Sequence, residues 1–104
     1  MDKTEALIIA QKYAEVVKDV FDFQKIILFG SYIKGNPNED SDIDIAIVFS
    51  DYTNLLDRQV ELMKLTRNVD SRIEPHPFRE KEFEISNPFV NEIITYGKEL
   101  TTVR

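Results

Sequence analysis

The chain has 104 residues, and this size predicts a single domain over residues 1–104 with room for a buried core. Its net charge of −6 disfavours direct nucleic-acid binding, and the lack of cysteine excludes disulfides and thiolate metal sites. No apolar run is long enough to cross a membrane and the first residues do not resemble a signal peptide, so we expect a cytoplasmic protein without membrane contact.

The first segment predicts a helix from Asp2 to about Phe21, with Asp2 and Glu5 as a capping box. Its apolar side chains recur at helical spacing, which indicates one face packed against a sheet. These residues are Ala6, Ile9, Tyr13, Val16, Val17 and Val20. A short strand rich in β-branched residues is predicted next, over Lys25–Phe29.

The central part of the chain predicts a turn, a loop and a second strand. After Gly30, residues 31–34 begin a helical turn in which Ser31 can serve as the cap. Residues 35–40 contain Gly, Pro and two Asn, which predicts a loop. Residues 42–49 predict a strand, and the unbroken apolar run at residues 45–49 indicates that both of its faces are covered.

A helix is predicted from Leu55 to about Asn68, with Leu56, Val60 and Met63 on one face. Leu55, Leu62 and Leu65 broaden its apolar surface, and Met63 is expected to fill a gap in the core. Residues 69–74 predict a third, weaker strand that ends at Pro75.

His76 lies between two prolines and is interpreted as a residue of a rigid loop. Because it is the chain's one histidine, the sequence disfavours histidine-based metal sites and catalytic triads.

The last third predicts a short helix or extended piece at residues 78–86, followed by a helix that begins at Asn87-Pro88 and stops at Gly97. The apolar face of this helix is predicted to comprise Phe89, Val90, Ile93, Ile94 and Tyr96. Residues 99–103 predict an edge strand. Helices and short strands that alternate in this way indicate an α/β or α+β fold with two layers.

Two aspartates, Asp42 and Asp44, stand at the head of the second strand. Residues two apart on a strand point to the same face, so the two carboxylates can converge on a hard cation such as Mg²⁺. The alternating pattern alone is also typical of an ordinary half-exposed strand. Two like charges at the head of a covered strand are costly unless they are paired or bind metal, which favours the metal site.

The motif Gly30-Ser31, ten residues, then Asp42-Ile43-Asp44 resembles the signature of the DNA polymerase beta-type nucleotidyltransferases. The small size is similar to the minimal nucleotidyltransferase (MNT) branch, whose members act as antitoxins beside HEPN toxins. The resemblance covers residue 25 to about residue 100. It implies a short mixed sheet with helices packed mainly on one face and a site at one end of the sheet.

The resemblance also implies roles for particular residues. Gly30 and Ser31 would hold nucleotide phosphates. Lys34 could reach a phosphate, and the alternative is that it is a solvated surface lysine. Asp42 and Asp44 would be metal ligands and catalytic residues.

A third carboxylate is expected from the neighbouring strand. Glu74 is at the matching place, where the family more often has aspartate, and it would be both a metal ligand and a catalytic residue. Asp70 is a competing candidate, because strand alternation places it on the same face as Glu74.

The implied function is Mg²⁺-dependent transfer of a nucleoside monophosphate from an NTP to a hydroxyl. The expected case is AMP from ATP, and another NTP is the alternative donor. The implied acceptor is a tyrosine of a partner HEPN toxin, for which the chain would be the antitoxin. Two alternatives stay open: an antitoxin with little or no catalysis that neutralises its partner by contact, and a nucleotide sensor. Assembly with copies of itself or with another chain also stays open.

Overall fold

The computed structural model describes residues 2–35 and 42–102. Its elements in chain order are α1 (Lys3–Val20), β1 (Lys25–Phe29), α2 (Ser31–Lys34), β2 (Ile43–Phe49), α3 (Leu55–Thr66), β3 (Ile73–Arg79), the 3-10 turn η1 (Glu80–Glu82), α4 (Pro88–Tyr96) and β4 (Lys98–Glu99). No helix in these two ranges has both the length and the apolar character that a membrane crossing requires.

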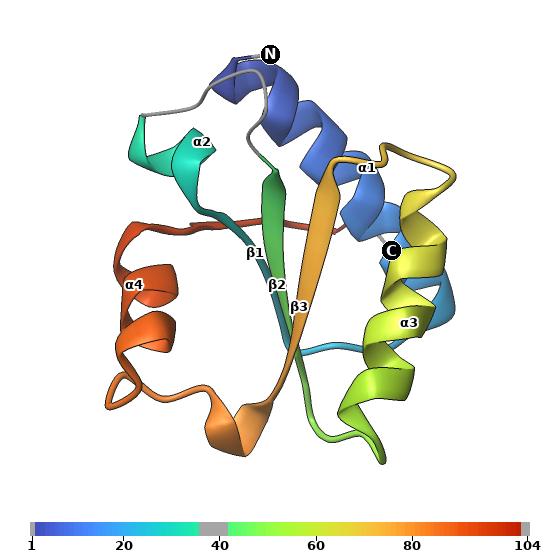
Figure 1. Ribbon diagram of the computed structural model, residues 1–104, viewed down its shortest axis with the longest axis vertical. Helices are drawn as coiled ribbons and strands as arrows, with labels where there is room; N and C mark the ends of the chain where they lie inside the picture. The colour runs from blue at the N-terminus through green and yellow to red at the C-terminus, as the bar shows by residue number, and fades with distance from the viewer. Residues whose placement is uncertain (1, 36–41, 103–104) are drawn as a thin grey trace.

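The four strands form one mixed sheet in the order β3-β2-β1-β4. β2 and β3 are parallel, whereas β1 is antiparallel to both β2 and β4. Figure 1 shows α1 and α3 on one side of the sheet and α4 on the other, with α2 at the end where β2 and β3 begin. The predicted α/β fold is therefore confirmed: the two long helices share one face, and α4 adds cover to the opposite face.

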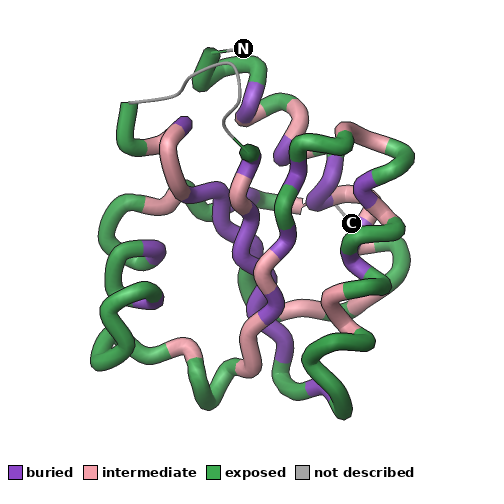
Figure 2. The backbone as a smooth tube through the Cα atoms, in the orientation of Figure 1, coloured by how far each residue is buried: buried purple, intermediate pink, exposed green. Residues whose placement is uncertain are grey.

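Side chains of β2 alternate between two different environments. Ile43, Ile45 and Ile47 point into the main core with α1 and α3, and each is fully buried. Ala46 points to the opposite face, where it packs with β1 and with Ile93 of α4. The buried residues follow the strands through the middle of the molecule (Figure 2). A polar residue on the α4 side of β2, at the end of the sheet, therefore lies next to a packed apolar cluster.

Three helices begin where the sequence supplies a side-chain cap. Asp2 Oδ1 accepts from the N–H of Glu5 at 2.9 Å, as predicted. Asn54 caps α3 in the same way, and Asn87 caps α4, with Pro88 in its first turn. The prediction that Gly97 ends this last helix is also confirmed.

The prediction that Pro75 ends the third strand was wrong. β3 runs through both prolines, from Ile73 to Arg79, and residues 69–72 lie outside it. β3 is an edge strand, so the proline positions can face away from β2, where no ladder donor is needed. The Pro75 carbonyl accepts from Gln59 Nε2 at 2.8 Å, and the Pro77 carbonyl accepts from the Tyr52 hydroxyl at 3.4 Å.

The expectation that Met63 of the third helix lies in the core was also wrong. Leu56, Val60 and Met63 are exposed, whereas Leu62 is fully buried against the core and Thr66 ends the helix two residues before the predicted end. Apolar residues occur around most of this helix, so their spacing does not determine which stripe meets α1.

The other predicted elements differ less from those in the structure. Val20 is exposed at the end of α1, and Val90 and Ile93 are the residues of α4 that are buried. Of the predicted loop at 35–40, only Gly35 lies within the described residues. The edge strand expected over residues 99–103 is shorter and begins one residue earlier, as β4, Lys98–Glu99. Residues 100–102 lie outside this strand, and Val103 lies outside the described residues.

Candidate functional site

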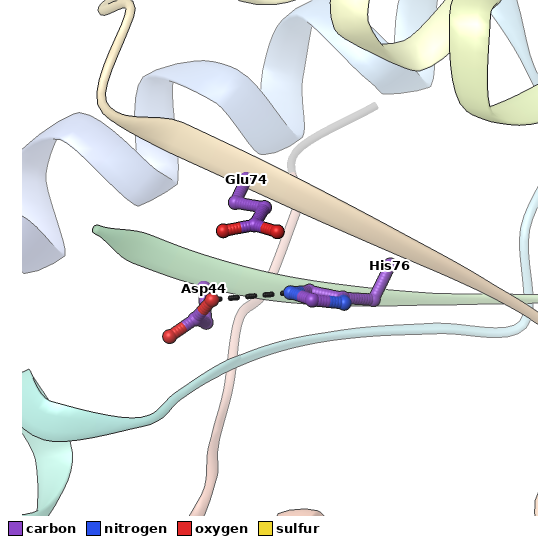
Figure 3. A group of neighbouring side chains, drawn as sticks. All are labelled: Asp44, Glu74 and His76. Atoms are coloured by element: carbon purple, nitrogen blue, oxygen red, sulfur yellow. Dashed lines mark hydrogen bonds and ion pairs between the residues drawn. The ribbon is translucent and has the colours of Figure 1, made fainter.

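The parallel pairing of β2 and β3 brings Asp44 and Glu74 together. The register places Asp44 opposite Glu74 and Ala46 opposite His76. One ligand atom from each of Asp44, Glu74 and His76 lies within 4.8 Å of the other two, so these residues could hold a metal ion. Figure 3 shows the three side chains converging on one face of the two strands.

Asp42 precedes β2 and belongs to the same group of carboxylates. The pKa of Glu74 is raised above its ordinary value, first by burial and then by a hydrogen bond with the Asp42 carboxyl. The negative charges of Asp44 and Asp42 raise this pKa further, and His76 opposes the shift. Three carboxylates placed this close together form a donor set that suits a divalent cation.

Asp70 lies in a different setting from Glu74. Its Oδ1 accepts from Arg72 Nε at 2.9 Å and its Oδ2 accepts from Arg72 Nη2 at 2.7 Å. This hydrogen bonding lowers the pKa of Asp70. The structure therefore brings Glu74, and not Asp70, to Asp44.

Gly30 joins β1 to α2 directly against Asp44. Its φ of 86° is in the left-handed region that favours glycine. A Cβ at this position would overlap Oδ2 of Asp44. The Gly-Ser turn and the aspartate pair, ten residues apart in sequence, therefore form one site.

Ser31 is the first residue of α2, and Gly30 holds the cap position without a side-chain hydrogen bond. The prediction that Ser31 caps this helix was wrong. The four-residue helix is fixed instead by Tyr32, which is buried in the main core. Ser31 is half-buried beside the turn.

Lys34 reaches toward α4. Its ammonium group forms an ion pair with Glu92, and it lies 5.5 Å from the centre of the Tyr96 ring. The hydrogen bond with Glu92 raises the pKa of Lys34. The pair ties α2 to α4 across the end of the sheet.

His76 is on β3 and in the site, so its interpretation as a loop residue was wrong. Its Nε2 lies 3.1 Å from Oδ1 of Asp44. Its ring packs against Phe29 at 5.2 Å and against Phe89 at 6.0 Å between ring centres. The signal was present as Glu74-x-His76, the same two-residue spacing that pairs Asp42 with Asp44.

A cleft of about 610 Å³ has His76 as part of its lining. It lies between α3, β3 and α4, and its lining is largely apolar. The lining includes Leu55, Leu56, Gln59, His76, Phe78 and Phe89. His76 is therefore shared between the carboxylate cluster and the cleft.

The family description "Polymerase beta, Nucleotidyltransferase" matches residues 11–102. The chain belongs to this nucleotidyltransferase family. A Methanocaldococcus jannaschii protein, provisionally named a protein adenylyltransferase, is 31% identical over 88 residues, which are 82% of this chain and 84% of that protein. Protein adenylyltransferase MntA of Shewanella oneidensis is 34% identical over 77 residues, 74% of this chain and 52% of that protein.

Solved structures agree with this assignment. A toxin–antitoxin complex with AMP-PNP matches with a TM-score of 0.68 and 29% identity, over 89% of this chain and 73% of that chain. A complex of tri-AMPylated Shewanella oneidensis HEPN toxin with MNT antitoxin matches with a TM-score of 0.64 and 26% identity, over 94% and 73% of the two chains. The resemblance to the minimal nucleotidyltransferases is thereby confirmed.

Proposed function

We propose that this chain is a Mg²⁺-dependent protein adenylyltransferase that transfers AMP from ATP to a tyrosine hydroxyl of a HEPN-type toxin and so acts as its antitoxin. The observation that carries this proposal is the meeting of Asp44 with Glu74 on one side and with Gly30 on the other. The turn at Gly30 lies directly against the carboxylate cluster. This arrangement suits a metal-bound nucleotide.

Asp42, Asp44 and Glu74 would hold the metal. Their oxygen ligands fit Mg²⁺. Burial is the first cause that raises the pKa of Glu74, and the neighbouring Asp42 and Asp44 raise it further, so a cation would favour its charged form. When bound, magnesium would neutralise negative charge on the phosphates at the reacting phosphorus. The carboxylates orient the nucleotide, and Glu74 would accept the proton of the acceptor hydroxyl.

Gly30 and Ser31 would contact the β- and γ-phosphates. Gly30 has no side chain of its own, so its backbone could closely approach a phosphate, and the Ser31 hydroxyl would act as a donor. Lys34 would add a positive charge, for which it must leave Glu92.

The direction of attack follows from the sheet order. In the transfer, the acceptor oxygen bonds to the α-phosphorus while the bond between that phosphorus and the bridging oxygen breaks, and pyrophosphate leaves with the electron pair. Attacking and leaving oxygens lie on opposite sides of the phosphorus. Because Gly30 and Ser31 flank Asp44 from β1, the acceptor would approach from β3, past His76, where the cleft opens.

The identity of the acceptor rests on the relatives. Two of them carry the name protein adenylyltransferase without qualification, and one solved complex contains an AMPylated HEPN toxin with its MNT antitoxin. A second chain that brings its own hydroxyl is consistent with an open cleft beside the cluster.

The test is transfer of label from α-³²P-ATP to a co-purified HEPN partner, with wild type, Asp42→Asn and Asp44→Asn. We expect Mg²⁺-dependent labelling of the partner by wild type and none by either variant. Labelling with γ-³²P-ATP is the control, because AMP transfer leaves no γ-phosphate on the product.

Two results would contradict the proposal. If both aspartate variants still neutralise the toxin and wild type leaves no label, the chain acts by contact. If ATP binds and remains intact while the partner's activity changes, the chain is a nucleotide sensor.

A further inference from the structure

His76 places an imidazole nitrogen next to the carboxylates that would hold magnesium. Its Nε2 is 3.1 Å from Oδ1 of Asp44, and the same cluster includes Glu74. Atoms that share one divalent ion lie about 3 to 4.4 Å apart, because each is about 2.0–2.2 Å from the ion. The spacing within the cluster, with all three ligand atoms inside 4.8 Å of one another, is therefore close to that of a bound set.

The ring is held in this position by its neighbours. Phe29 and Phe89 contact the imidazole, at 5.2 and 6.0 Å between ring centres. Ala46 is the residue opposite His76 in the register, and its small side chain leaves room for the ring to lean toward Asp44. The side chain is 26% exposed, so a metal ion with bound water can reach it.

The flanking prolines fix the backbone on each side of His76. Each has its φ locked by the ring, which restricts the conformations of β3 around the histidine. This pre-organisation, together with the aromatic contacts, points the imidazole at the carboxylates before any ion arrives.

We propose that His76 is a nitrogen ligand, through Nε2, of the metal that Asp44 and Glu74 bind, and that it raises the affinity of this site for Mn²⁺ relative to Mg²⁺. The inference rests on the metal site of the proposed function. Magnesium prefers oxygen ligands, whereas first-row transition ions also accept imidazole. The tautomer that binds carries its proton on Nδ1, which leaves the Nε2 lone pair for the ion.

The chain's single histidine makes a direct test possible. We would measure pulsed EPR of Mn²⁺ bound to tag-free protein, with natural-abundance histidine and with ¹⁵N-histidine. A directly bound imidazole gives a nitrogen hyperfine coupling that changes with the isotope, and this coupling can be assigned only to His76. A hydrogen bond from His76 to Asp44 without ligation gives no such coupling.

Calorimetric affinities for Mn²⁺ and Mg²⁺ complete the test. His76→Phe retains a ring against Phe29 and Phe89, and His76→Gln retains an N–H donor for Asp44. We expect both variants to lose roughly 10–100-fold in Mn²⁺ affinity and less in Mg²⁺ affinity. Thermal unfolding would verify that the His76→Phe chain is folded.

The outcomes separate the two proposals. If Mn²⁺ binds wild type without nitrogen coupling and binds both His76 variants equally well, the inference is overturned while the carboxylate site stands. If Asp44→Asn also leaves Mn²⁺ binding unchanged, the metal site of the proposed function itself is wrong.

Discussion

Gly30 and Asp44 are in such close contact that a methyl group on Gly30 would overlap Oδ2 of Asp44. The chain therefore cannot build this site with any other residue at position 30 unless the aspartate moves. Gly35 has nearly the same φ, 85° against 86°, but a Cβ there would meet nothing within 4 Å.

Gly30→Ala and Gly35→Ala form a matched pair. Gly35→Ala should lose about 1–2 kcal/mol of unfolding free energy, because alanine is strained at positive φ. Gly30→Ala should lose more, because its Cβ would also overlap the Asp44 carboxylate. Only Gly30→Ala should also weaken metal and ATP binding, since it displaces the Asp44 carboxylate. Urea unfolding and calorimetry would measure both effects, and equal ligand binding by the two variants would refute the contact argument.

Glu74→Gln should reduce Mg²⁺ affinity by roughly 10–100-fold, because it removes a ligand. Asp70→Asn is the control, since both Asp70 oxygens are engaged by Arg72. We expect it to leave Mg²⁺ affinity unchanged. The reverse result in a calorimetric titration would make Asp70 the third carboxylate.

The raised pKa of Glu74 predicts a pH dependence of stability without metal. From about its ordinary value of 4.5 upward, the folded chain binds more protons than the unfolded chain until Glu74 ionises. Stability contributed by the protonated form is therefore lost as pH rises through this window. Glu74→Gln should flatten that fall in urea unfolding curves recorded in EDTA, whereas Glu84→Gln, outside the site, should not.

Glu92→Gln should increase ATP affinity, because it releases Lys34 from its ion pair. The gain should stay below about ten-fold, since exposed ion pairs are weak. Lys34→Met should decrease the affinity, and the double variant should match Lys34→Met. An unchanged affinity in all three would place Lys34 outside the nucleotide site.

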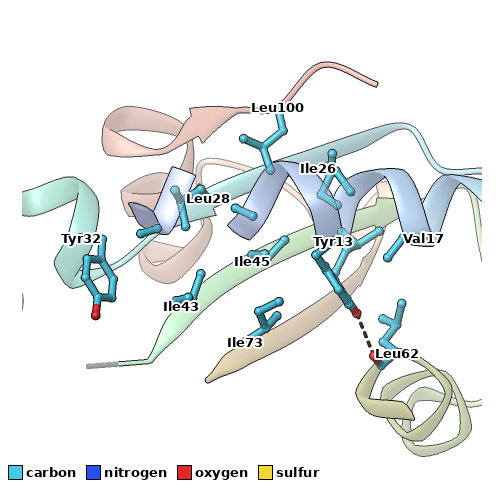
Figure 4. Packing of buried hydrophobic residues seen from close by; sticks show 14 of the residues in the cluster. Tyr13, Val17, Ile26, Leu28, Tyr32, Ile43, Ile45, Leu62, Ile73 and Leu100 are labelled. Atoms are coloured by element: carbon cyan, nitrogen blue, oxygen red, sulfur yellow. Dashed lines mark hydrogen bonds between the residues drawn. The ribbon is translucent and has the colours of Figure 1, made fainter. Parts of the chain in front are cut away.

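Tyr13→Phe should destabilise the fold without affecting the site. Tyr13 is fully buried, and its hydroxyl donates to the carbonyl of Leu62 at 2.8 Å, which links α1 to α3 (Figure 4). Loss of this hydrogen bond should cost about 1–2 kcal/mol in urea unfolding. Metal binding should persist, because the contact is on the opposite face of the sheet from Asp44. A weaker metal site in this variant would mean that the two faces are coupled.

Much of the fold could be predicted from local patterns. Caps at Asp2 and Asn87 and the apolar runs of β1 and β2 are determined by neighbouring residues, so sequence was sufficient for them. The buried face of α3 was not predictable in this way, because it depends on which stripe meets Tyr13. Only the packed structure distinguishes Leu62 from Leu56.

The residues of the candidate site also include some that the sequence could predict and some that it could not. Gly30, Asp42 and Asp44 are linked by spacing that a sequence displays. His76 was missed because prolines were taken to end β3, although proline is compatible with an edge strand. The sequence favours Glu74 as the third carboxylate, with Asp70 as its competitor, and that Glu74 lies opposite Asp44 depends on the register between β2 and β3, which is a long-range property.

The two prolines of β3 also decide how this sheet can meet other chains. Pro75 and Pro77 have no N–H, and side chains of Gln59 and Tyr52 already occupy their carbonyls. At the other margin, β4 has only two residues, Lys98 and Glu99, both charged. Among the residues that the structure describes, neither edge strand presents a row of free backbone groups with which another polypeptide could pair, which disfavours ordered aggregation through these edges. Any partner must therefore be recognised through side chains on the helices and around the cleft.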